Sequence, residues 1–176
     1  MELRTEATID QPRDVVFRAY RDELPDLISY LPNVRRIEVK SRQEKGGLVE
    51  LVNVWYGGGD IPAALRAVLS ESVLSWTDYA SWNDQDHTCT WRNETAFKEA
   101  VNSHGVNHFV EQGAGRTVIR IDGRIDVDAS KVPGVPRLVA GKVGKLIESF
   151  LVKQVQDNLQ EVARGVGRYL REKGAR

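Results

Sequence analysis

The sequence has few of the residues that fix a chain by covalent links or anchor it in a membrane. It contains one cysteine, Cys89, which excludes an internal disulfide and is typical of a reducing compartment. The chain shows no long apolar run, and its first ten residues are charged and lack the apolar core of a signal peptide. We therefore expect a cytoplasmic protein without an integral membrane segment.

Neither sign of charge dominates, since 25 basic side chains balance 25 acidic ones. Residues 1–130 carry 15 basic and 21 acidic side chains, and residues 131–176 carry the other 10 and 4. A basic C-terminal segment can contact lipid headgroups or nucleic acid. Because Asp157 and Glu161 lie among its basic residues, a solvated helix face explains the pattern, and we expect no nucleic-acid partner.

The 176 residues, 41% of them hydrophobic, match the size and composition of one globular domain. No internal repeat or low-complexity stretch interrupts the chain. We therefore expect a single domain over residues 1–176.

The hydrophobic pattern changes period along the chain. A strand over residues 3–9 precedes a helical segment that starts near Pro12 with Asp10 as the expected N-cap, breaks at Pro25 and ends at Pro32. Residues 34–127 alternate with period two and divide into about six antiparallel strands, one of them at residues 106–111, with a short helix-like piece at residues 62–69. One long helical pattern runs from residue 136 to about residue 173, and its apolar stripe changes direction near residue 150. The pattern predicts an α+β fold in which a curved antiparallel sheet wraps around a long C-terminal helix.

Three short segments support this prediction by resemblance. Residues 7–17, Ala-Thr-Ile-Asp-Gln-Pro-Arg-Asp-Val-Val-Phe, resemble the first strand and Pro-started helix of the START-like (SRPBCC) superfamily, and residues 60–66 and 121–125 are similar to a bacterial branch of it. That superfamily has the helix-grip fold and includes birch-pollen-allergen-like proteins, polyketide cyclases and lipid-transfer START domains. The resemblance covers nearly the whole chain and implies a fold that is commonly hollow between the sheet and the long helix. None of the three segments is a catalytic motif.

Candidate binding residues follow from strand alternation around the four tryptophans, all of which lie in residues 55–91. His87, Cys89, Trp91 and Asn93 share one face of their strand, and alternation with Val106 and Val110 predicts that His108 points inward. Tyr79 and the pair Trp76 and Trp82 favour opposite faces of the preceding strand, which leaves its inward face open. The candidate ligand-binding residues are Trp55, Trp76, Asp78, His87, Cys89, Trp91, Asn93, His108, Val143 and Ile147.

Aromatic walls with a few polar groups are typical of a small-molecule cavity, and a closed core with satisfied Trp and His side chains is the alternative. The resemblance favours the cavity. Our leading hypothesis is the binding of a hydrophobic or amphipathic small molecule, such as a lipid or a polyketide-like compound. One alternative is a cyclase, aromatase or dehydratase in which Asp78, His87 and His108 move protons. Another is a protein-interaction module with a filled core, which would use the C-terminal helix or residues 62–69.

Neither a metal nor a cofactor is expected. The spacing of His87, Cys89, His104 and His108 is not that of a compact zinc site. The glycines at residues 57–59 and 141–144 lack the pattern of a phosphate-binding loop. The sequence defines neither the ligand nor the oligomeric state.

Overall fold

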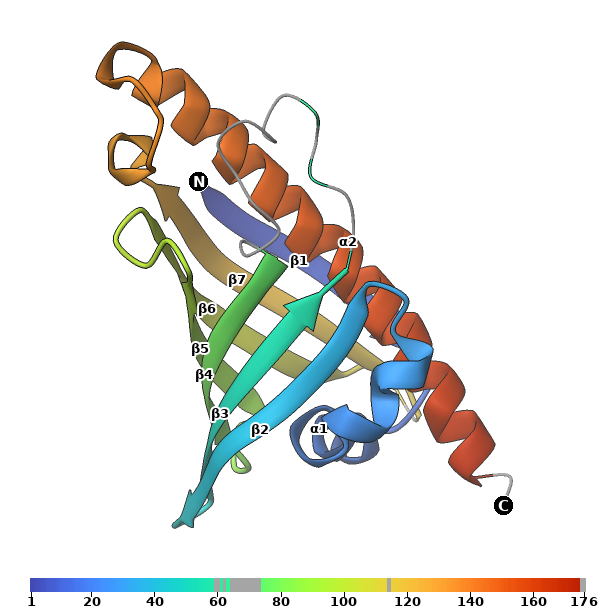
Figure 1. Ribbon diagram of the computed structural model, residues 1–176. Helices are drawn as coiled ribbons and strands as arrows, with labels where there is room; N and C mark the ends of the chain where they lie inside the picture. Colours follow the sequence, from blue (N-terminus) through green and yellow to red (C-terminus); the bar gives the residue numbers. More distant parts are fainter. Residues whose placement is uncertain (59–60, 62, 64–73, 114, 175–176) are drawn as a thin grey trace.

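A curved antiparallel sheet surrounds the long C-terminal helix (Figure 1). The computed structural model describes residues 1–58, 61, 63, 74–113 and 115–174. Seven strands form the sheet in the order β1-β7-β6-β5-β4-β3-β2. Their bounds are β1 Glu2–Ile9, β2 Val34–Lys45, β3 Leu48–Gly57, β4 Ser75–Asn83, β5 Thr88–Thr95, β6 Val101–Glu111 and β7 Thr117–Val127. The predicted helix-grip fold is confirmed.

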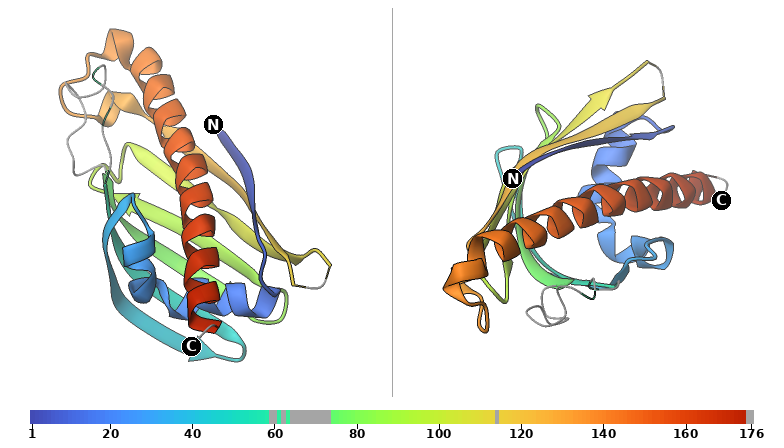
Figure 2. Two further views of the ribbon diagram at one scale, coloured as in Figure 1. Left: turned by 90° about the vertical axis from the view of Figure 1, so that its right-hand side faces the viewer. Right: turned by 90° about the horizontal axis from the view of Figure 1, so that it is seen from above.

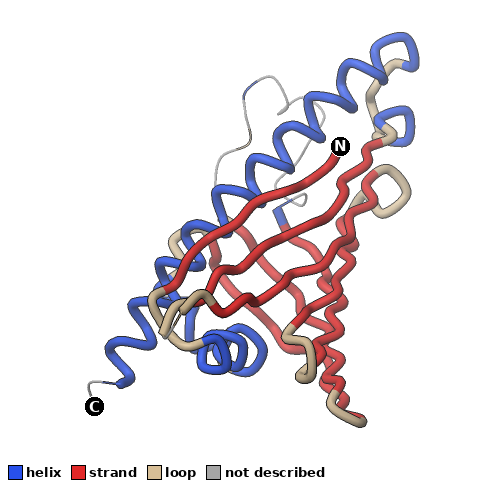
Figure 3. The backbone as a smooth tube through the Cα atoms, turned by 180° about the vertical axis from the view of Figure 1, so that it is seen from behind, coloured by secondary structure: helices blue, strands red, loops and turns tan. Residues whose placement is uncertain are grey.

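The helices lie on the concave side and at the ends of this sheet. The long helix α2, Ala140–Gly174, follows two short 3-10 turns, η4 Ala129–Lys131 and η5 Arg137–Val139. Seen from above, α2 runs through the concavity of the sheet (Figure 2). Helix α1, Arg13–Asp22, and the 3-10 helix η1, Leu24–Tyr30, lie together near the C-terminal end of α2 (Figure 3). The helical segment breaks at Glu23, between α1 and η1, and Pro25 lies in the first turn of η1.

Two apolar clusters form the core, and α2 contributes to both. Its first half buries Ile147 in the smaller cluster, against Ala129 and Val132. Its second half buries Leu159 and Val166 in the larger cluster, which the sheet and α1 complete. This division explains why the apolar stripe of the helix changes direction midway.

Two local predictions differ from the structure, and a third lies almost wholly outside the described residues. Asp10 does not cap α1; Pro12 occupies the N-cap position, and Asp10 pairs with Arg116 at 3.0 Å. Strand β6 begins at Val101, five residues before the predicted start at residue 106. The helix-like piece predicted at residues 62–69 lies outside the described residues, apart from residue 63.

Among the helices that the structure describes, none combines the length and the apolar character needed to cross a bilayer.

Candidate functional site

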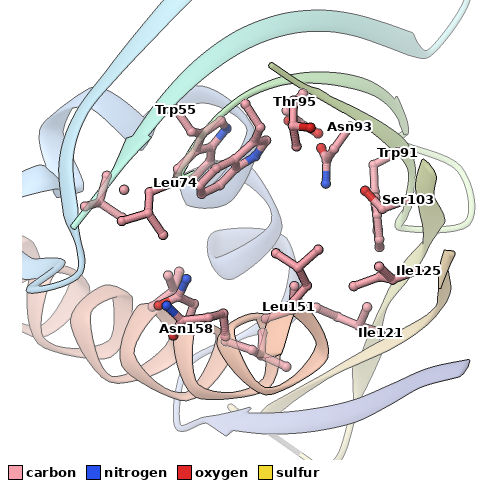
Figure 4. Close-up of a pocket in the computed structure, with 18 of the residues that line it drawn as sticks. Trp55, Leu74, Trp91, Asn93, Thr95, Ser103, Ile121, Ile125, Leu151 and Asn158 are labelled. Carbon is pink, nitrogen blue, oxygen red and sulfur yellow. The ribbon is translucent and has the colours of Figure 1, made fainter. Parts of the chain in front are cut away.

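A cavity of about 260 Å³ lies between the concave face of the sheet and the middle of α2. Figure 4 shows side chains from both layers pointing into this space. Most of the wall is apolar, with the four tryptophans on the sheet side and mainly aliphatic groups on the helix side. The apolar lining residues include Trp55, Trp76, Trp82, Trp91, Ile121 and Ile125 from the sheet, and Phe150, Leu151, Val155, Leu159 and Val162 from α2.

A row of polar side chains crosses the inner face of the sheet at the level of the cavity. Asn53 on β3 is paired in register with Asp78 on β4, and Asp78 is paired with Asn93 on β5. Asn93 is paired in turn with Ser103 on β6. Side chains directly opposite in an antiparallel pair have Cβ atoms about 4.5–5.5 Å apart, so each member of the row is within reach of the next. Asp78 is the only ionisable member.

Aromatic side chains lie on both sides of the polar row. On one side Trp55 and Trp76 stack with their ring centroids 5.7 Å apart and their planes 7° apart. On the other side Trp91 donates a hydrogen bond from Nε1 to Asn107 Oδ1 at 2.8 Å. The Trp91 ring lies over Gly105, where a Cβ atom would be 2.6 Å from Trp91 Cζ2. The absence of a side chain at residue 105 therefore makes room for the indole.

The Asp78 carboxyl is the main electrostatic feature of the site. Burial raises its pKa from 3.8 to about 7, against a smaller opposing effect of the Asn53 and Trp55 side chains. The Trp55 N–H lies outside hydrogen-bond geometry with any described group, so its opposing effect is weak. Asp78 is half-buried because part of its surface faces the cavity. A carboxyl with a pKa near 7 can accept or donate a proton at neutral pH.

Several other polar groups at the cavity lack partners. The Tyr20 hydroxyl, Trp82 Nε1 and Asn93 Oδ1 are buried without a hydrogen bond to any described group. All three residues line the cavity. A buried polar group without a partner costs about 1–3 kcal/mol. A guest with hydrogen-bonding groups would recover part of that free energy.

The structure brings six of the ten predicted residues together at the cavity, namely Trp55, Trp76, Asp78, Cys89, Trp91 and Asn93. The open question about β4 is also answered. Trp76, Asp78 and Trp82 face inward, and Tyr79 faces outward under the guanidinium of Arg92, which lies 3.7 Å from its ring centroid.

His87 does not line the cavity. It belongs to the turn before β5, with a φ of 55°, and so does not follow the alternation of Cys89 and Trp91. Its Nε2 atom lies 3.0 Å from Asp14 Oδ1, and its ring packs edge-on against Phe17. The turn therefore directs the imidazole to α1.

His108 also lies elsewhere, and the prediction that it points inward is wrong. In register it lies between Thr88 on β5 and Arg120 on β7, and it is on the face of β6 opposite to the buried Phe109. The inward residues of β6 are the odd-numbered ones, which include Ser103 and Asn107. Because both histidines lie away from the cavity, the structure does not assemble the proposed Asp78, His87 and His108 proton relay.

Val143 and Ile147 lie one to two turns before the part of α2 that covers the cavity. Ile147 is fully buried in the smaller core cluster, and Val143 packs against the same cluster. The first half of α2 therefore fills one end of the molecule, and residues 150–162 cover the cavity instead.

Cys89 is buried on the cavity wall. Burial, and to a lesser degree the charge of Asp78, raises the pKa of its thiol well above the usual value. Such a thiol stays protonated and unreactive at neutral pH. Within the described part of the chain, no three His, Cys, Asp or Glu side chains gather to hold a metal ion.

Sequence reasoning missed the polar groups that α2 and β6 contribute. Gln154 and Asn158 line the cavity from the helix, and Ser103 does so from the sheet. Gln154 and Asn158 could have been found from the sequence, because they are four residues apart and interrupt the apolar stripe on one face of the helix. Ser103 could not have been found in this way, because its strand starts earlier than the alternation predicted.

Comparisons with known proteins support the fold. No family model and no curated protein sequence matches the chain, whereas many solved structures do. The ZhuI aromatase/cyclase of a Streptomyces species is similar with a TM-score of 0.68 at 16% identity, over 99% of this chain and 98% of that one. A Thermus thermophilus protein has a TM-score of 0.67 at 19% identity, over 94% and 97%. Truncated norcoclaurine synthase of Thalictrum flavum has a TM-score of 0.61 at 13% identity, over 97% and 92%. At these identities the likeness concerns the helix-grip fold.

Proposed function

We propose that the protein binds a small, largely apolar molecule in the cavity between the sheet and α2. The observation that carries this proposal is the wall itself, in which four tryptophans and a set of aliphatic side chains surround one row of polar groups. An apolar cavity with a few convergent polar groups is the usual form of a ligand site. Its volume of about 260 Å³ is just below the ~300–1,000 Å³ of drug-sized sites, so the guest is small.

Polar atoms at the cavity that have no described hydrogen-bond partner also support the binding proposal. Tyr20 and Asn93 line the cavity, and the Tyr20 hydroxyl and Asn93 Oδ1 have no hydrogen bond to any described group, so a guest with hydrogen-bonding groups can pair with them. A filled interior would suit an interaction module, whereas the cavity suits a binding protein.

A substituted α2 residue tests the proposal directly. Leu151 lines the cavity, and Leu146 on the same helix is 55% exposed. Leu151→Trp should fill the cavity and abolish binding of the neutral fluorophore N-phenyl-1-naphthylamine, while Leu146→Trp should bind like the unsubstituted protein. The measurement is a fluorescence titration, with native mass spectrometry to detect a co-purifying molecule. Absence of saturable binding, or equal binding by both variants, would contradict the proposal.

A cyclase-like enzyme is the second candidate. The ZhuI neighbour is an aromatase/cyclase by name, and the raised pKa of Asp78 suits general acid–base catalysis at neutral pH. In this version Asp78 acts without either histidine. Conversion of a linear poly-β-ketone by the protein, and its loss in Asp78→Asn, would support the enzyme; unchanged conversion in that variant would remove Asp78 from the reaction.

A further inference from the structure

Every ionisable side chain among the described residues that line the cavity is an acid. Among the described lining residues these are Tyr20, Asp78 and Cys89, and none of the others in that set is a lysine, arginine or histidine. Burial raises the pKa values of the Tyr20 hydroxyl and the Cys89 thiol, which keeps both groups neutral. An ionised Asp78 is therefore the one charge on the described wall.

No described group neutralises that charge. The polar residues of α2 that line the cavity, Gln154 and Asn158, are uncharged amides. On the sheet, its neighbours in register are the amides Asn53 and Asn93. A carboxylate held away from water requires a cation or several hydrogen bonds. The protein supplies some hydrogen bonding through Asn53 and leaves room for a cation.

The aromatic groups beside the carboxyl suit the same kind of partner. Trp55 and Trp76 form a stacked pair in the row next to Asp78, and Trp91 belongs to the row on its other side. Indole faces are the strongest cation–π partners among the side chains, and aromatic surfaces recognise ammonium groups in proteins. The carboxyl and the indole side chains thus lie in adjacent rows of the same cavity wall.

We propose that the guest is a small organic amine, bound as its ammonium ion against Asp78, with an apolar body in contact with the tryptophans. This inference rests on the proposed binding function and specifies its ligand class. A fatty acid or other carboxylate would place a second negative charge next to Asp78, so the same geometry disfavours an anionic guest.

Three probes that share one apolar body test the charge preference. They are 2-(2-naphthyl)ethylamine, 2-(2-naphthyl)ethanol and 2-naphthylacetic acid, titrated into the protein by calorimetry at pH 8. A charge-assisted hydrogen bond in a buried site corresponds to roughly 10- to 100-fold in affinity. We expect the amine to bind tighter than the alcohol by that factor, and the carboxylate to bind weakest.

Asp78→Asn is the decisive variant, because it keeps the shape of the side chain and removes its charge. The preference for the amine over the alcohol should fall to within about threefold, while the alcohol still binds. Asp122→Asn is the matched control, since Asp122 is exposed on the outer face of β7 and should leave every affinity unchanged.

Proton release gives a second readout that needs no substitution. At pH 6 the Asp78 carboxyl of the free protein is mostly protonated, because its pKa is about 7. Binding of an ammonium ion should therefore expel close to one proton, measured by calorimetry in two buffers of different ionisation enthalpy, and the alcohol should expel none.

The possible results distinguish the amine inference from the proposed binding function. Equal binding of amine and alcohol, or tightest binding of the carboxylate, would overturn the amine inference and leave the binding function standing. Binding of none of the three probes would overturn both. An amine preference that survives in Asp78→Asn would also overturn the inference, because the charge would then come from another group.

Discussion

Asp78→Asn should stabilise the protein at alkaline pH and have little effect at acid pH. The pKa of this carboxyl rises from 3.8 in the unfolded chain to about 7 in the folded protein. The folded state therefore holds its proton more tightly than the unfolded state does. As the pH rises from about 4 to about 7, the unfolded chain ionises first, and the free energy of unfolding falls.

The size of the effect follows from that shift. About three pKa units at 1.36 kcal/mol each correspond to about 4 kcal/mol of lost stability above pH 7. Because part of Asp78 faces the cavity, where water can enter, this figure is an upper value. Asparagine has the same shape and does not ionise, so Asp78→Asn avoids the loss. The amide can still pair with the Asn53 side chain.

Urea unfolding followed by circular dichroism at pH 4.5 and pH 8.5 measures this prediction. The variant should gain about 2–4 kcal/mol relative to the unsubstituted protein between the two pH values. Other titrating groups occur in both proteins and cancel in the difference. A difference that does not change with pH would show that the Asp78 carboxyl is not desolvated and would refute the reasoning.

Asp22→Asn provides a control of opposite sign. Burial of Asp22 opposes ionisation, but hydrogen bonds from Arg21 and Arg42 outweigh it, and the net result is a lowered pKa. A lowered pKa stabilises the folded state above the unfolded value and loses that contribution as the pH falls. Asp22→Asn should therefore destabilise the protein at pH 7 and have less effect near pH 3.

Three further predictions concern packing and metal. Trp91→Ala should cost about 3–5 kcal/mol in urea unfolding, because a buried indole and its hydrogen bond to Asn107 are lost; an unchanged midpoint would show an exposed side chain. Gly105→Ala should cost at least 1–3 kcal/mol in the same assay, since the new Cβ would lie 2.6 Å from both the Trp91 ring and the Asp122 carbonyl oxygen, and a neutral effect would contradict that packing. A strong chelator should leave the melting temperature unchanged, and a marked drop would point to a structural metal.

Local chemistry accounts for the part of the fold that could be predicted from the sequence. Pro25 indicates the start of a second helix, η1, and alternation along residues 117–127 distinguishes the dry face of β7 from its wet face. The long helical pattern after Pro136 corresponds to α2. These features depend on neighbours a few residues away, and such neighbours are visible in a sequence.

The inward face of β6 depends on a partner far along the chain. Alternation of Val106 and Val110 predicted an inward His108, yet the opposite face is buried because Gly105 must lie under Trp91 of the adjacent strand. A shift of one residue moves every side chain of a strand to the other face. The predicted facing of His87 was wrong for a different reason. His87 itself has a positive φ at the end of a turn, and this conformation takes it out of the strand alternation.

The positions of the unpaired polar groups also support a binding cavity. Native proteins leave only a few buried polar groups unpaired per hundred residues. In the described part of this chain six buried side-chain atoms lack a hydrogen-bond partner, and one of them, Arg13 Nε, belongs to a residue that does not line the cavity. The other five belong to cavity-lining residues or to Asn53 next to Asp78; these residues are Tyr20, Asn53, Trp55, Trp82 and Asn93.

Replacing buried polar groups by apolar groups of the same shape is often neutral or stabilising, so stability alone does not require polar groups at these positions. The smaller core cluster, by comparison, is built from apolar side chains such as Val132 and Ile147. Polar groups kept at a cost around one cavity are the arrangement expected where a guest completes their hydrogen bonds. The same reasoning explains why Asp78→Asn should have two opposite effects, a more stable protein above pH 7 and a weaker site for an ammonium ion.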